Sequence, residues 1–91
     1  MGISLNHTIV VARDKEKTAT FLTEMLGLPP HKRLGHFAAV SVSETSLDFV
    51  ETDVPIEPRH FAFLVSDGEF DEILQRIRDR QLPVLGGPVP P

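Results

Sequence analysis

Two histidines stand at matching places in two similar stretches of the chain. His7 opens the apolar run Thr-Ile-Val-Val-Ala, and His60, 53 positions later, opens Phe-Ala-Phe-Leu-Val. Asp14 and Asp67 follow these runs at the same spacing. A neutral imidazole is a good ligand for zinc, nickel, iron or manganese ions. A lone strand histidine more simply has its ring nitrogens satisfied by neighbours, but a pair at repeated positions favours a metal site shared by two copies of one unit.

The first copy contains the elements that would position His7. Residues 3–11 form a β-branched run of strand length, and Asp14 is a suitable N-cap for the helical pattern that follows and ends at Gly27. Residues 31–34, 36–43 and 46–51 then read as three strands, the last two with the period-two alternation of half-buried strands. The order is βαβββ, so the fold class is α+β.

The second copy is predicted to be shorter. Residues 52–58 contain two prolines and no periodicity, so they read as a linker. A strand beginning at His60 and a helix with one apolar stripe follow, and the stripe consists of Phe70, Ile73, Leu74 and Ile77. We therefore expect a complete βαβββ module over residues 1–55 and an incomplete βα module over residues 56–91, together forming one domain.

Composition narrows the classes of function. The 91 residues have a formal charge of -4 and no clustered basic stretch, which argues against nucleic-acid and anionic-membrane partners. Cysteine is absent, so a metal site would have to use His, Asp or Glu. The longest uninterrupted apolar run is much shorter than the roughly 20 residues that span a bilayer. A cytoplasmic protein with a small-molecule ligand is the expectation.

The order of these elements resembles the vicinal oxygen chelate superfamily, which includes glyoxalase I, extradiol dioxygenases and the fosfomycin and bleomycin resistance proteins. The resemblance covers essentially the whole chain. It implies paired βαβββ modules, each a cupped half-barrel, with a divalent metal (iron, zinc, nickel or manganese) bound between the two sheets. In this resemblance His7 and His60 correspond to the histidine ligands. Asp48 matches a carboxylate ligand that only some members use.

The chain departs from the family pattern in one respect. A glutamate on the last strand of the second module is the ligand that nearly all metal-binding members share, and the repeat offset puts it near position 101, beyond Pro91. The resemblance therefore implies either that the sequence is a piece of a longer protein or that another chain completes the site. Because unpaired sheet edges need cover, we expect a homodimer, and exchange of elements between the two chains is one arrangement that would provide the cover.

Other histidines and the phenylalanines have simpler interpretations. His31 and His36 could form a rival metal site, but both lie beside turn signals and are expected to be exposed. Four phenylalanines could line a ligand cup, although some of them must fill the core. Of the four, Phe37 and Phe49 are the predicted substrate-lining residues. No further catalytic residue is predicted.

Three functions remain open from the sequence. The first is a metal-dependent lyase, isomerase or ring-cleaving dioxygenase that binds a substrate through adjacent oxygens, because a divalent ion with open positions polarises such oxygens. The second is a metal-free module of the bleomycin-resistance type that sequesters a small ligand, and the negative charge suits a cationic one. The third is a regulatory or structural half-module that acts only through pairing.

Overall fold

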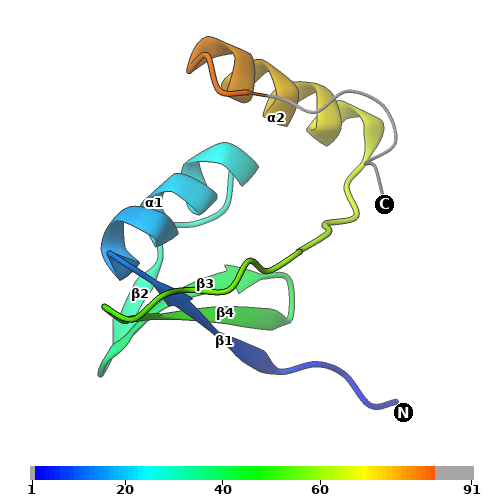
Figure 1. Ribbon diagram of the computed structural model, residues 1–91. Helices are drawn as coiled ribbons and strands as arrows, with labels where there is room; N and C mark the ends of the chain where they lie inside the picture. The colour runs from blue at the N-terminus through cyan, green and yellow to red at the C-terminus, as the bar shows by residue number, and fades with distance from the viewer. Residues whose placement is uncertain (1, 84–91) are drawn as a thin grey trace. The chain divides into compact units, whose positions relative to one another are not determined.

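A computed structural model describes residues 2–83 of the chain (Figure 1). The chain divides into two compact units, residues 1–60 and residues 61–91. Residues 84–91, the end of the predicted second module, lie outside the described residues. Within residues 2–83, neither helix has the length and apolar character to cross a membrane.

The first unit is a four-stranded sheet with one helix. The elements are β1 (His7–Ala12), α1 (Lys15–Leu26), β2 (Lys32–Leu34), β3 (Phe37–Val42) and β4 (Thr45–Glu51). The strand order is β1-β4-β3-β2, with β1 parallel to β4 and the other neighbours antiparallel. This is the predicted βαβββ module, and α1 lies across one face of its sheet (Figure 1).

Local sequence signals determine both ends of α1. Asp14 is the N-cap, and its side chain accepts a hydrogen bond of 3.0 Å from the backbone N–H of Lys17. Gly27 ends the helix with φ of 68°, a left-handed conformation that glycine adopts without steric cost. Both caps are confirmed as predicted. They determine where the chain leaves β1 and where it returns toward β2.

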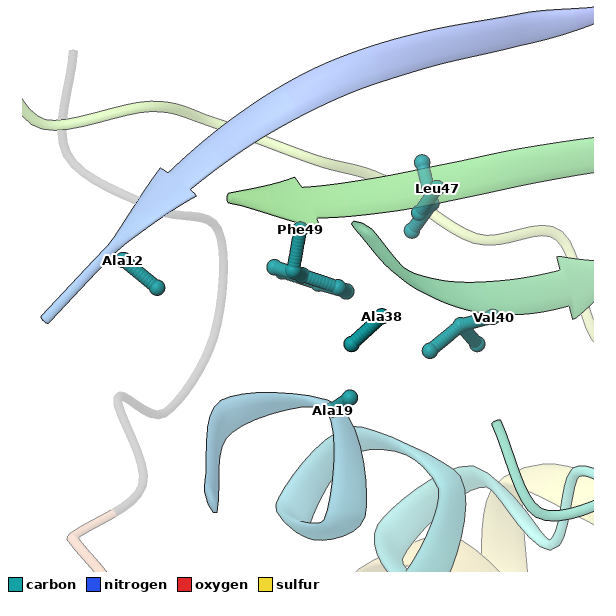
Figure 2. Close-up of a cluster of buried hydrophobic side chains, with 6 residues drawn as sticks. All are labelled: Ala12, Ala19, Ala38, Val40, Leu47 and Phe49. Atoms are coloured by element: carbon teal, nitrogen blue, oxygen red, sulfur yellow. The ribbon is translucent and has the colours of Figure 1, made fainter. Parts of the chain in front are cut away.

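The core lies between the sheet and α1. Figure 2 shows side chains of β1, β3 and β4 directed toward Ala19 of the helix. The buried cluster consists of Ala12, Ala19, Ala38, Val40, Leu47 and Phe49. Three of the six are alanines, which allows the helix to approach the sheet closely. Phe49 is the largest member of the cluster.

The second unit contains α2 (Asp67–Asp79). Ser66 and Glu69 form a capping box: the backbone N–H of Glu69 donates to the Ser66 Oγ, and the backbone N–H of Ser66 donates to the Glu69 Oε1 at 2.8 Å. The hydrogen bond from that backbone N–H lowers the pKa of the Glu69 carboxyl. The predicted apolar stripe is present, but Phe70 is 56% exposed, and none of the helix residues is buried.

The strand predicted to begin at His60 is not formed, since residues 52–66 belong to no helix or strand. In the first module, β1 is stabilised by hydrogen bonds to β4 of the same module. The repeat offset places the equivalent of β4 beyond Pro91. A strand needs a neighbour for its backbone N–H and C=O groups, so the sequence pattern alone does not produce one here.

Candidate functional site

His7 and Asp48 lie on the same face of the sheet. Side chains alternate along a strand, so His7 and Ile9 share one face of β1. In the parallel register His7 pairs with Ser46 and Ile9 pairs with Asp48, which places both β4 residues on that face. Leu47 and the other core residues of β4 point toward α1 instead. We call the face opposite α1 the site face; its residues are His7, Ile9, Val11, Lys32, Leu34, Phe37, Ala39, Ser41, Ser46, Asp48 and Val50.

The spacing allows His7 and Asp48 to reach one ligand. They come from neighbouring strands and are offset by two residues along the strand direction. Strand separation and rise per residue put their Cα atoms roughly 8 Å apart. An imidazole and a carboxylate extended from such positions can converge on a single ion. Their nitrogen and oxygen atoms are also donors that first-row divalent metals accept.

The His7 side chain is exposed and held by its neighbour in sequence. Its Nδ1 lies 2.7 Å from the Oδ1 of Asn6. An amide oxygen can only accept, so Nδ1 carries the proton of the neutral ring. The lone pair is then on Nε2, the nitrogen available to a metal or substrate.

The Asp48 carboxylate is half-buried and also has a partner on the site face. The Ser46 Oγ donates to the Asp48 Oδ1 at 2.5 Å, a short distance typical of a hydroxyl bound to a charged carboxylate. Ser46 is also the residue beside His7 in the sheet register. Ser46 is therefore a neighbour of both predicted ligands, of His7 across the strands and of Asp48 along β4.

The two predicted substrate-lining phenylalanines lie on opposite faces of the sheet. Phe37 is on the site face, because Ala39 pairs with Asp48 and Phe37 is two residues away on β3. Phe49 is only 4% exposed and belongs to the core cluster against α1 (Figure 2). The expectation that Phe49 lines a ligand is therefore wrong, because alternation along β4 gives Phe49 and Asp48 opposite directions.

His31 is not the exposed residue that its position after two prolines suggested. Its side chain is 15% exposed, and its Nε2 donates to the Glu16 Oε1 at 2.9 Å. The Arg33 Nε donates to the same oxygen, also at 2.9 Å. The adjacent Lys15 Nζ donates to the His36 backbone oxygen at 3.0 Å. Lys15 and Glu16, two successive residues of α1, thus bind the segment that contains the β2–β3 hairpin. His36 itself is exposed, as predicted.

This ion-pair cluster gives an expected pH dependence. Hydrogen bonds from His31 and then Arg33 lower the pKa of Glu16 below its ordinary 4.5. A lowered pKa in the folded state means that the Glu16 carboxylate stabilises the fold above about pH 5, and that this contribution is lost as pH falls through the folded-state pKa. Glu16→Gln should therefore lower the melting temperature at pH 6 and differ less from the wild type as the pH is lowered below 4.5.

Thermal unfolding followed by circular dichroism across this pH range measures that effect. Glu44→Gln is the matched control, because Glu44 is exposed in the turn between β3 and β4. A constant difference between Glu16→Gln and the wild type from pH 6 to pH 3 would contradict the assignment.

The structure does not assemble a complete metal centre. Among residues 2–83, no group of three or more His, Asp or Glu side chains is placed to hold a metal ion. His60 is exposed and belongs to no such group. His7 and Asp48 are two side chains on the site face whose donor atoms suit a divalent metal, fewer than the three that such a group requires. Any further ligands have to come from elsewhere.

A shallow depression lies away from these residues, at the end of β4. Its lining residues are Arg13, Glu51, Thr52 and Asp53, and its volume is about 320 Å³. The Arg13 Nη1 donates to the Thr52 backbone oxygen at 2.7 Å. None of the predicted site residues lines this depression, so it does not contribute to the candidate site.

Sequence reasoning did not single out Asn6 and Ser46. Two local signals could have identified them. Asn6 directly precedes the predicted ligand His7, and Ser46 is two residues from Asp48 and so shares its face of β4. Polar neighbours that hydrogen-bond to ligand side chains are a general feature of metal sites.

The βαβββ module places His7 on its first strand and Asp48 on its last strand, on one face of the sheet. The model of the Glyoxalase/Bleomycin resistance protein/Dioxygenase superfamily matches residues 4–91. The chain belongs to this family, which confirms the resemblance to the vicinal oxygen chelate proteins and the α+β fold class.

Three relatives show how far the similarity extends. Glutathione transferase FosA from Serratia marcescens is 31% identical over 81 residues, which cover 81% of this chain and 57% of the relative. The solved structure of oxidase ChaP-H1 is 49% identical with a TM-score of 0.85, over 88% of this chain and 65% of that chain. Oxidase ChaP-H2 is 44% identical with a TM-score of 0.84, over 88% and 64%. The chain thus spans less than two thirds of the length of each.

Proposed function

We propose that the protein is a metal-dependent enzyme that binds a small substrate through two adjacent oxygens. The observation that carries this proposal is the placement of His7 and Asp48 on one face of the sheet, on neighbouring strands and two residues out of register. His60, at the position equivalent to His7, is the third ligand that the repeat implies in this proposal; among residues 2–83 it is not grouped with His7 and Asp48. The metal is divalent iron, zinc, nickel or manganese.

Each residue has a role in this proposal. A bound divalent ion supplies Lewis-acid chemistry, and iron also supplies chemistry with dioxygen. His7 and Asp48 hold the ion and leave neighbouring positions for the substrate oxygens. Ile9, Phe37 and Val50 present apolar surface on the same face, which suits the carbon skeleton of a substrate.

The relatives support oxidation as the reaction type. Two solved structures that exceed 40% identity are named oxidases, whereas the glutathione transferase is less similar. We therefore place oxidation ahead of lyase and isomerase chemistry. The homodimer expected from the sequence belongs to this proposal, and light scattering that shows a monomer at micromolar concentration would contradict it.

A metal titration tests the proposal. Protein purified without a histidine tag should bind Mn²⁺ or Zn²⁺ with near-unit stoichiometry by calorimetry. Because a ligand that binds only the folded state stabilises it, metal at about 100 times Kd should add roughly 2.7 kcal/mol to the free energy of unfolding, and EDTA should reverse the gain.

The same measurement distinguishes the metal-dependent enzyme from the alternative function, a metal-free binding protein. A metal-free sequestering protein of the bleomycin-resistance type would show no shift with metal or EDTA. It would instead show an EDTA-insensitive rise in melting temperature with a small cationic or apolar ligand. That pattern would contradict the metal-dependent enzyme.

A further inference from the structure

Two hydrogen bonds beside the candidate site restrict the side-chain orientations of His7 and Asp48, the predicted ligands, before any metal binds. The Asn6 Oδ1 accepts from the His7 Nδ1 at 2.7 Å, and the Ser46 Oγ donates to the Asp48 Oδ1 at 2.5 Å. The partner of each ligand lies one or two residues away in sequence. Ser46 belongs to β4 together with Asp48, and Asn6 directly precedes β1, which begins at His7.

The contact with Asn6 determines which ring nitrogen of His7 is free. A neutral imidazole carries one N–H, and a carbonyl oxygen as partner requires that N–H to be at Nδ1. The lone pair is then on Nε2, for which residues 2–83 provide no hydrogen-bond partner. Replacing Asn6 by an apolar residue would let the proton move to Nε2 and the exposed ring rotate.

The contact with Ser46 determines the orientation of the Asp48 carboxylate. Ser46 and Asp48 share the site face, and Ser46 lies beside His7 in the parallel register. With Oδ1 engaged by the hydroxyl, Oδ2 remains as the carboxylate oxygen without a hydrogen-bond donor among residues 2–83. A carboxylate held in one rotamer loses less conformational freedom when it binds an ion.

We propose that Asn6 and Ser46 are positioning residues, which present the His7 Nε2 and an Asp48 oxygen to a divalent metal ion. This inference rests on the proposed function, in which His7 and Asp48 are ligands. Partners of metal ligands typically contribute 10- to 100-fold to metal affinity. We expect a loss of that size for Asn6→Ala and for Ser46→Ala.

The first test requires no metal. Long-range ¹H–¹⁵N correlation spectra of ¹⁵N-histidine-labelled protein, at a pH where imidazole is neutral, report which ring nitrogen carries the proton. Wild-type His7 should show the Nδ1–H tautomer, and Asn6→Ala should lose that preference while the exposed His36 stays unchanged. The same tautomer in the wild type and in Asn6→Ala would overturn the role of Asn6.

The second test measures Mn²⁺ affinity by calorimetry. Ser46→Ala should bind about 10- to 100-fold more weakly, and Ser46→Thr, which keeps the hydroxyl, should recover most of the affinity. Ser41→Ala is the matched control, because Ser41 lies on the site face directly opposite Ser46 on the neighbouring strand. The melting temperature of each variant shows whether the fold is intact.

The outcomes distinguish this inference from the proposed function. Wild-type protein that binds no Mn²⁺ would overturn the proposed function, and this inference with it. Wild-type protein that binds Mn²⁺ while Asn6→Ala and Ser46→Ala bind equally well would overturn this inference alone. Weaker binding by Ser41→Ala to the same degree as Ser46→Ala would also overturn it, since the effect would then be general to the site face.

Discussion

His7→Ala is expected to weaken Mn²⁺ binding by about 100-fold or more, because loss of a ligand should cost at least as much as loss of a ligand's hydrogen-bonding partner. Asp48→Asn should have a similar effect, since it removes the negative charge and keeps the size of the side chain. His7 is exposed, so its replacement should leave the fold intact. Calorimetric titration of each variant, with circular dichroism as a check of folding, measures these effects.

A histidine outside the site face provides the control for these variants. His36 is exposed in the turn between β2 and β3, and His36→Ala should bind Mn²⁺ as the wild type does. His60→Ala tests the third ligand, and its affinity should fall in the same range as that of His7→Ala. Unchanged affinity in His7→Ala would contradict the assignment of the site.

Phe49→Ala is expected to lower the free energy of unfolding by about 3 to 5 kcal/mol, the usual cost of removing a buried aromatic ring. Phe49 is 4% exposed and is the largest side chain in a core cluster that otherwise contains three alanines, one valine and one leucine. Small domains have only about 5 to 15 kcal/mol of stability, so much of it would be lost. Urea unfolding followed by circular dichroism measures the difference.

Phe21 offers the same substitution at an exposed position. It lies on α1 and is 44% exposed. Phe21→Ala should cost about 1 kcal/mol or less, because little packing is lost and alanine favours the helix. Equal destabilisation by Phe21→Ala and Phe49→Ala would show that Phe49 is not part of the core, and would restore it as a candidate for ligand contact.

Local signals were sufficient for the elements of the first module. The Asp14 and Gly27 caps involve contacts within a few residues, so the sequence predicts the limits of α1 without knowledge of the sheet. Alternation likewise assigns Leu47 and Asp48 to opposite faces of β4. The sequence also predicted the family, through the repeat of His7 and His60.

The errors arose where distant segments decide the outcome. His31 follows two prolines, and no local signal indicates that Glu16, fifteen residues earlier, accepts its hydrogen bond. Phenylalanine as a residue type suits either a core or a ligand cup, so the sequence of β4 does not decide between the two for Phe49. Which face of β4 is the core depends on the side of the sheet that α1 covers.

The sequence by itself determined the βαβββ order, the helix caps and the residue types of the candidate site. Only the tertiary structure decided that β1 pairs with β4 in parallel, which brings His7 beside Ser46 and near Asp48. It also decided that the run after His60 forms no strand in the described chain. The reason is physical: a helix satisfies its backbone hydrogen bonds within itself, whereas a strand requires a second segment, so strand pairing cannot be deduced from either segment alone.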